Sequence, residues 1–330
     1  MPQNNNNSTT LLELALLAKD VYTKNAKDRG VNGWEVVDDQ RTSNFDSGLQ
    51  IQNYRNDNHP NHTVIAIAGT NGLNDWDDNL SFVTGGFSEQ FQQAMTHAAK
   101  TIDAAVKNSE HSKTANKTFS VTGHSLGGGI AQIIAYTFGL NGVTLDAPGA
   151  NAIISSKKYQ AHLALLQQKY PNAFNDVGGT PDTGENFTNI VEQGSIVSSI
   201  GTHIGTKMEI DAVGDTDTVI GAIMMAVNPL IGLAIMAASL FGNHDIQPII
   251  DYVQDDPNLN KLQLTGEKIE QLHCELGAIA RESKIGNPID AFTFETTTQA
   301  LDPWQGNDIV ELNDQGKWVV NAPTIAFNDI

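Results

Sequence analysis

The pentapeptide Gly-His-Ser-Leu-Gly at residues 123–127 constrains the fold of this chain more than any other feature of its sequence. The run before it, residues 117–122, is rich in β-branched and aromatic side chains, as strands are, and residues 126–138 read as a helix that opens in glycines. A strand that passes directly into a helix needs a sharp turn, and the two flanking glycines leave room for a close approach. The segment therefore predicts a strand, a tight turn and a helix.

Other segments extend this pattern into a sheet. Residues 63–68 (TVIAIA) form a short apolar run typical of a strand buried on both faces, and residues 142–145 (GVTL) predict a further strand. Helices are expected at residues 11–22 and 88–106 from their apolar spacing. Strands and helices in this order predict an α/β fold with a mostly parallel sheet flanked by helices.

Ser125, the central residue of the predicted turn, is the candidate nucleophile. A turn of this kind lifts the serine hydroxyl to the end of the sheet, where a general base can reach it. The backbone N–H of Leu126 stands at the start of the following helix, where it can donate to an oxyanion with the support of the helix dipole. This arrangement predicts nucleophilic acyl transfer.

A second motif follows the first buried strand. Residues 68–80 read AGTNGLNDWDDNL, and together with GHSLGG they resemble the class 3 lipases, which include fungal triacylglycerol lipases and bacterial phospholipases. The resemblance covers residues 60–150 and extends more loosely to about residue 255. It implies an α/β-hydrolase fold and places Thr70 as the second oxyanion donor.

The resemblance also indicates a domain organisation. Residues 1–10 are polar and rich in asparagine, and they are interpreted as a flexible tail. Residues 11–255 are predicted to form one α/β-hydrolase catalytic domain. Residues 256–330 are expected to be a C-terminal extension packed on the same domain, with a turn at residues 313–316 before a short strand.

The general base is expected to be a histidine, which follows the serine in the chain order of α/β hydrolases. His244 lies in a predicted loop before a predicted helix (IQPIIDYV) at residues 246–253, and the catalytic histidine of related lipases lies in a similar loop late in the domain. His203 is the alternative, but it is interpreted as a residue that packs or forms hydrogen bonds near the site.

The acid of the triad has several candidates. The resemblance expects an aspartate where this chain has Ser195, and serine cannot supply a negative charge. Asp146 is favoured, because it follows the strand next to the nucleophile and because pancreatic-type lipases use an aspartate at a comparable place. Asp211 is the alternative acid, and Asp215 and Asp217 are less favoured.

Residues 219–241 form an apolar segment without a charge. Its length would suit a membrane span, but Asn228 and Pro229 interrupt it, so two short helices fit better. The segment is interpreted as an apolar helical lid-like insertion or a membrane-dipping hairpin, with Leu230 and Ile231 as lid or membrane contacts. A buried hairpin in the core is the alternative.

The charge and cysteine content exclude some classes of function. A net charge of −19 opposes binding to nucleic acid, and a single cysteine, Cys274, forms neither an internal disulfide nor a cysteine metal cluster. No metal or organic cofactor is required by the predicted chemistry. Because residues 1–10 lack the features of a signal peptide, the protein is expected to be cytoplasmic or exported by a signal-peptide-independent route.

These features predict a hydrolase of carboxylic esters in lipids, a phospholipase A or a triacylglycerol lipase, whose substrate is a lipid or a membrane. A thioesterase or acyltransferase with the same apparatus is one alternative. A membrane-binding or membrane-perturbing protein with an impaired site is another, and a toxin effector would suit the absent signal peptide. Secretion machinery and an inhibitor partner remain unassigned.

Replacing both Leu230 and Ile231 with serine tests the lid. We expect activity on phospholipid vesicles to fall more than activity on a soluble short-chain ester, because only the vesicle requires an apolar contact. Parallel assays on the two substrates measure the difference. Equal losses on both substrates would contradict a lid at this segment.

Overall fold

The computed structural model describes residues 9–23, 28–37, 47–60, 62–69, 86–108, 118–174, 187–193, 195, 197–212, 245–257, 259–261, 310–312 and 318–320. The chain divides into two compact units, Met1–Lys284 and Ile285–Ile330. Residues 1–8 of the tail predicted at 1–10 and the predicted lid at 219–241 lie outside the described residues, whereas Thr9 is buried and Thr10 caps the first helix. The packing of residues 256–330 onto the first unit stays a prediction.

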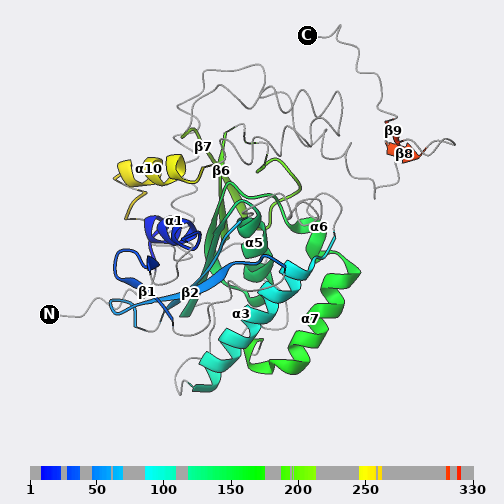
Figure 1. Ribbon diagram of the computed structural model, residues 1–330, viewed down its shortest axis with the longest axis horizontal. Helices are drawn as coiled ribbons and strands as arrows, with labels where there is room; N and C mark the ends of the chain where they lie inside the picture. The colour runs from blue at the N-terminus through cyan, green and yellow to red at the C-terminus, as the bar shows by residue number, and fades with distance from the viewer. Residues whose placement is uncertain are drawn as a thin grey trace, which may run out of the picture. The chain divides into compact units, whose positions relative to one another are not determined.

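A seven-stranded sheet forms the centre of the first unit, with its strands in chain order from β1 to β7 (Figure 1). Strands β1 and β2 pair antiparallel, as do β2 and β3, whereas all pairs from β3 to β7 are parallel. The strands are β1 Trp34–Val36, β2 Ile51–Asn56, β3 Thr63–Ile67, β4 Phe119–His124, β5 Asn141–Leu145, β6 Phe187–Glu192 and β7 Thr206–Ile210. The mostly parallel sheet confirms the predicted α/β fold.

Helices cover both faces of this sheet (Figure 1). One face packs against α1 (Leu11–Asp20) and α10 (Gln247–Asp255), and the other packs against α3 (Glu89–Asn108) and α5 (Leu126–Phe138). The short α6 (Asn151–Ile154), α7 (Lys157–Lys169) and the 3-10 turn η3 (Pro171–Ala173) extend the second layer. Two apolar core clusters, one on each face of the sheet, therefore hold three layers together.

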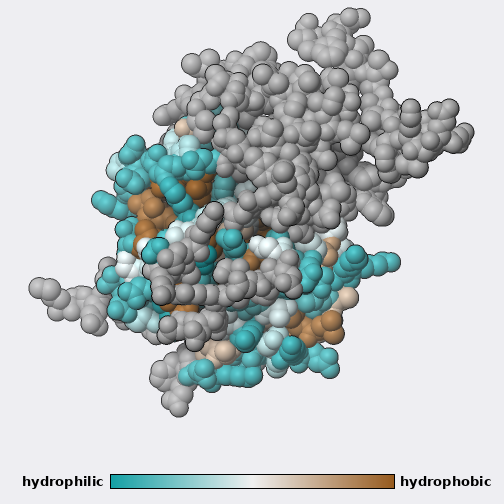
Figure 2. Space-filling model, viewed as in Figure 1, coloured by the Kyte–Doolittle hydropathy of each residue, from teal (hydrophilic) through white to brown (hydrophobic). Residues whose placement is uncertain are grey.

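Apolar side chains are concentrated in these two clusters. On the face shown in Figure 2, hydrophilic residues cover most of the described surface, and apolar residues form small separate areas. Among the described residues, no helix is long and apolar enough to cross a membrane.

The predicted elements agree with the structure where the sequence pattern is strong. The helix expected at 126–138 has those bounds, and the strand expected at 63–68 is β3, in which every residue is buried. The strand expected at 117–122 is displaced by two residues and becomes β4. The second unit contains a hairpin of β8 (Val310–Leu312) and β9 (Trp318–Val320), which brackets the turn predicted at 313–316.

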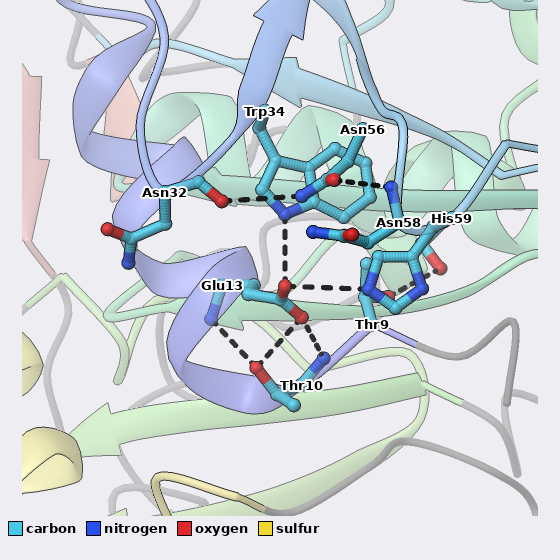
Figure 3. Close-up of polar contacts among 9 residues, drawn as sticks. Thr9, Thr10, Glu13, Asn32, Trp34, Asn56, Asn58 and His59 are labelled. Carbon is cyan, nitrogen blue, oxygen red and sulfur yellow. Dashed lines mark hydrogen bonds and ion pairs between the residues drawn. The ribbon is translucent and has the colours of Figure 1, made fainter. Parts of the chain in front are cut away.

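Helix α1 is fixed at its N-terminus by the carboxylate of Glu13 (Figure 3). The Thr10 hydroxyl accepts from the Glu13 N–H at 3.2 Å, and the Thr10 N–H donates to Glu13 Oε2 at 2.7 Å, which completes a capping box. The same carboxylate accepts a hydrogen bond of 3.1 Å from Trp34 Nε1 and lies 3.7 Å from His59 Nε2. One side chain thus caps α1 and ties it to the antiparallel edge of the sheet.

Replacing Glu13 with alanine should lower the free energy of unfolding by about 2–4 kcal/mol. The cap contributes about 1 kcal/mol, and the buried Trp34 N–H would lose its partner at a cost of about 1–3 kcal/mol. Urea unfolding measures the change, with Glu35→Ala on the exposed side of β1 as the matched control. Equal stability of the two variants would show that the Glu13 network adds nothing.

Candidate active site

Ser125 occupies a strained turn between β4 and α5. Its φ of 56° and ψ of −133° are unusual for a residue with a side chain, and such a conformation costs about 1–3 kcal/mol. Hydrogen bonds hold the turn: the Ser125 N–H donates to the Leu145 carbonyl at 3.1 Å, and the Ser125 carbonyl accepts from the N–H groups of Gly128 and Gly129. The serine hydroxyl makes no capping hydrogen bond to the helix that follows it.

The glycines of the motif are required by contact with neighbouring backbone. A Cβ built on Gly127 would lie 2.3 Å from the Ile67 carbonyl oxygen and 2.6 Å from that of Ala68. A Cβ on Gly123 would lie 2.5 Å from the Gly127 oxygen. The end of β3 and the first turn of α5 are therefore in direct backbone contact, as the sequence predicts for a close approach of strand and helix.

Of the two predicted oxyanion donors, Leu126 lies within the described residues and Thr70 does not. Leu126 is the first residue of α5, where N–H groups lack partners within the helix and the helix dipole favours negative charge. Thr70 lies outside the described residues, so its role stays a prediction. Its neighbour Gly69 is described, and a Cβ there would lie 3.0 Å from Ser125 Cβ. The chain after β3 therefore arrives beside the candidate nucleophile.

Asp146 lies directly after β5, the strand next to the one that ends at the nucleophile. It is buried and has a positive φ of 44°, and its N–H donates to the Ile190 carbonyl at 2.7 Å. Its carboxylate accepts a hydrogen bond of 2.8 Å from the Ser195 hydroxyl and one of 3.3 Å from the Glu192 N–H. These contacts give the carboxylate a defined orientation at the carboxyl edge of the sheet.

Ser195, which stands where an aspartate is expected, is thus in contact with the favoured acid. The Ser195 hydroxyl also accepts a hydrogen bond of 3.3 Å from the Ser198 N–H, so its proton is directed toward Asp146. The carboxylate reaches from the end of β5 to the segment after β6. Asp146 and Ser195 occupy the two positions at which an acid is considered from the sequence. In the structure their side chains are buried and hydrogen-bonded to each other.

The alternative acids have other surroundings. Asp211 follows β7 and is exposed, and its charge contributes to the raised pKa of Tyr252, for which burial is the main cause. Asp215 and Asp217 lie outside the described residues. Of the described candidates, Asp146 alone combines burial with a position on the strand beside the nucleophile.

His203 has a structural role. Its Nε2 donates to the Ser198 carbonyl at 2.8 Å, so Nδ1 accepts from the Gln132 amide at 3.3 Å. Gln132 also binds the Pro148 carbonyl and the Ile204 N–H, and burial lowers the pKa of His203. A neutral ring with both nitrogens engaged holds two loops together. His244, the predicted base, lies outside the described residues.

The sequence motifs do not point to two further residues of this region. Tyr22 follows α1, and its hydroxyl contacts both Gly69 and His124. Gln132 faces the loops after β5 and β6 from the middle of α5. A polar residue in an otherwise apolar helix is the one signal that could have identified Gln132, whereas a tyrosine at a helix end carries none.

Residues 13–235 match a family of known proteins, described as Phospholipase-like, Tle-like phospholipase domain. The match covers more than half of the chain and includes β3, the turn at Ser125 and the carboxylate of Asp146. The chain belongs to this family of Tle-like phospholipase domains.

A protein with a similar sequence is also named as a phospholipase. An "Extracellular phospholipase A1" of Serratia liquefaciens is 36% identical over 148 residues, which are 42% of this chain and 42% of the relative. The match therefore spans less than half the length of that relative. The family and the relative confirm the predicted resemblance to lipases and phospholipases and agree with the predicted class of lipid-ester hydrolase. The narrower assignment to class 3 lipases stays a prediction.

Proposed function

We propose that this protein is a phospholipase A that hydrolyses an acyl ester of a membrane phospholipid through an acyl-enzyme on Ser125. The observation that carries the proposal is the strained turn at Ser125, pressed against the end of β3, in a chain of a phospholipase family. The name of the Serratia liquefaciens relative supports cleavage at the sn-1 position, as a phospholipase A1 performs.

The proposed reaction has two stages. The Ser125 oxygen attacks the ester carbonyl carbon while His244 takes the hydroxyl proton, and the resulting oxyanion is held by the N–H groups of Leu126 and Thr70. The proton then passes to the leaving oxygen, and lysophospholipid departs. Water, deprotonated by the same histidine, attacks the acyl-enzyme, releases a fatty acid and restores the serine.

Asp146 is proposed as the acid that orients His244 and stabilises the imidazolium. Its support is a buried carboxylate on the strand beside the nucleophile, oriented by Ser195 and Glu192. The rival hypothesis of an impaired site rested on the serine at position 195. A carboxylate bonded to that serine supports a complete triad instead.

The substrate and the location of the protein follow from the same reasoning. A lipid substrate is expected of a phospholipase family member, and the relative's name supports action outside the producing cell. The strongly negative net charge of −19 would repel an anionic bilayer, so contact with lipid would have to come from apolar side chains.

Lipid mass spectrometry after incubation with mixed phospholipids and triacylglycerols tests the proposed function. We expect equal amounts of free fatty acid and lysophospholipid, with the remaining acyl chain at the sn-2 position. Ser125→Ala should lose at least about 10⁴-fold in rate, because no nucleophile remains to form the acyl-enzyme.

The control is labelling by a fluorophosphonate, which reacts only with an activated serine. Wild-type protein should be labelled and Ser125→Ala should not. Folded wild-type protein that neither reacts nor releases fatty acid would refute the hydrolase proposal. Release from triacylglycerol alone would refute the phospholipase assignment.

Moving the carboxylate from position 146, after β5, to position 195, after β6, tests whether Asp146 is the acid of the triad. Asp146→Ser should lower kcat/KM by about 10⁴-fold, because the histidine loses its orienting charge. Adding Ser195→Asp to that variant returns a carboxylate to a position within hydrogen-bond distance of the original one. We expect the double variant to recover at least about tenfold of the roughly 10⁴-fold loss, because a carboxylate is again present to orient the histidine and stabilise the imidazolium.

Asp211→Asn is the matched control, since Asp211 is also an aspartate that follows a parallel strand but is exposed. It should leave kcat/KM within about twofold, as exposed substitutions away from a site usually do. Full activity of folded Asp146→Ser would remove Asp146 from the triad. A large loss in Asp211→Asn would assign the acid there.

A further inference from the structure

We propose that the hydroxyl of Tyr22 positions the oxyanion hole by holding the chain after β3 against the nucleophile turn. The inference rests on the proposed function, because it concerns the same Ser125 site. Tyr22 would be a positioning residue, since it acts through the backbone of Gly69 and touches no reacting atom.

The Tyr22 hydroxyl connects the ends of two strands. It accepts a hydrogen bond of 2.7 Å from the N–H of Gly69, which follows β3. It also lies 3.1 Å from Nδ1 and 3.4 Å from the carbonyl oxygen of His124, the last residue of β4. Its one proton is therefore donated to the residue directly before Ser125, while its oxygen holds the residue directly before Thr70.

Packing leaves little room for these groups to move. A Cβ on Gly69 would lie 2.6 Å from the Tyr22 oxygen, 2.8 Å from the His124 carbonyl oxygen and 3.0 Å from Ser125 Cβ. Gly69 is thus enclosed between the hydroxyl and the nucleophile turn. Burial raises the pKa of Tyr22, so the hydroxyl keeps its proton and its dual hydrogen-bonding role throughout the working pH range.

The residues that precede and follow Tyr22 in the chain are also held by hydrogen bonds. Before it, Asp20 Oδ2 accepts a hydrogen bond of 2.9 Å from the Tyr54 hydroxyl on β2. After it, the Thr23 carbonyl accepts one of 2.8 Å from Arg29 Nε, which is buried. The segment that carries the hydroxyl is therefore fixed to the sheet independently of Gly69.

The hydrogen bonds of Tyr22 matter for the proposed reaction because oxyanion donors must already be in position when the negative charge develops. A displacement of about 1 Å in such a group can cost about 100-fold in rate. The donor proposed at Thr70 is one residue from Gly69, and the donor at Leu126 is two residues from His124. One hydroxyl that bonds both Gly69 and His124 sets the spacing between the two chain segments that lead to the proposed donors.

Tyr22→Phe removes only the oxygen and tests the proposal. We expect kcat on a soluble p-nitrophenyl ester to fall about 10–100-fold with KM within about twofold, because an oxyanion contact strengthens only in the transition state. Because the buried Gly69 N–H loses its acceptor, the substitution should cost about 1–3 kcal/mol of stability, which is less than the stability of a typical domain, so the variant should stay folded.

A comparison of the oxygen ester with its thionoester separates positioning from a general structural effect. Sulfur is larger and a weaker acceptor than oxygen, so the thionoester gains less from the oxyanion hole. The rate ratio of ester to thionoester should therefore fall in Tyr22→Phe. Tyr159→Phe, which removes a buried hydroxyl bonded to Thr137 on the other face of the sheet, should leave that ratio unchanged.

Gly69→Ala provides a second variant, since its methyl group would meet the Tyr22 hydroxyl at 2.6 Å and the His124 carbonyl oxygen at 2.8 Å and so disturb the same spacing while the hydroxyl is kept. It should lower the same ratio. An active wild-type protein whose ratio is unchanged in folded Tyr22→Phe would overturn the role of Tyr22 and leave the proposed function intact. A wild-type protein inert to both esters and to fluorophosphonate would instead overturn the proposed function, and this inference with it.

Discussion

The rest of the structure depends on the backbone contact between the turn at Ser125 and the end of β3. Because Gly127 has no side chain, the first turn of α5 packs directly against the carbonyl groups of Ile67 and Ala68. A Cβ at position 127 would overlap with both carbonyl oxygens. Hydrogen bonds from this packed environment offset the strain of the positive φ at Ser125. The same contact determines how close the N–H groups at the start of α5 come to the chain that leaves β3, and hence the width of any oxyanion hole between them.

The proposed acid, Asp146, illustrates how neighbouring strands of a parallel sheet place side chains at the same edge. Asp146 follows β5, yet its carboxylate is bound by Glu192 and Ser195, which belong to β6 and the segment after it. A charge needed at one point in space can therefore come from either strand. Serine at position 195 does not leave that point without a charge, since its hydroxyl holds the carboxylate that the adjacent strand supplies.

The sequence predicted well what depends on local order. A glycine-flanked serine between a β-rich run and a helix defines the nucleophile turn, and the apolar run at β3 identifies a strand buried on both faces. Chain order alone could not reveal the bond between Asp146 and Ser195, nor the contact of Tyr22 with Gly69, because each joins residues that are distant in sequence. Strand β7 was missed because only two buried apolar residues, Met208 and Ile210, alternate with its exposed charges, which is a short run for recognising a half-buried strand.

Helix α1 links these parts, although it carries none of the proposed catalytic groups. Its first turn is bound through Glu13 to Trp34 and His59 beside the antiparallel strands, and Tyr22 directly beyond its last turn is bound to the ends of β3 and β4. Because α1 is one continuous helix that packs on β3, β4 and β5, a shift at its first turn would also move the segment that carries the Tyr22 hydroxyl. The antiparallel edge, remote from Ser125 in sequence, is therefore connected through α1 to the edge of the sheet at which Ser125 lies.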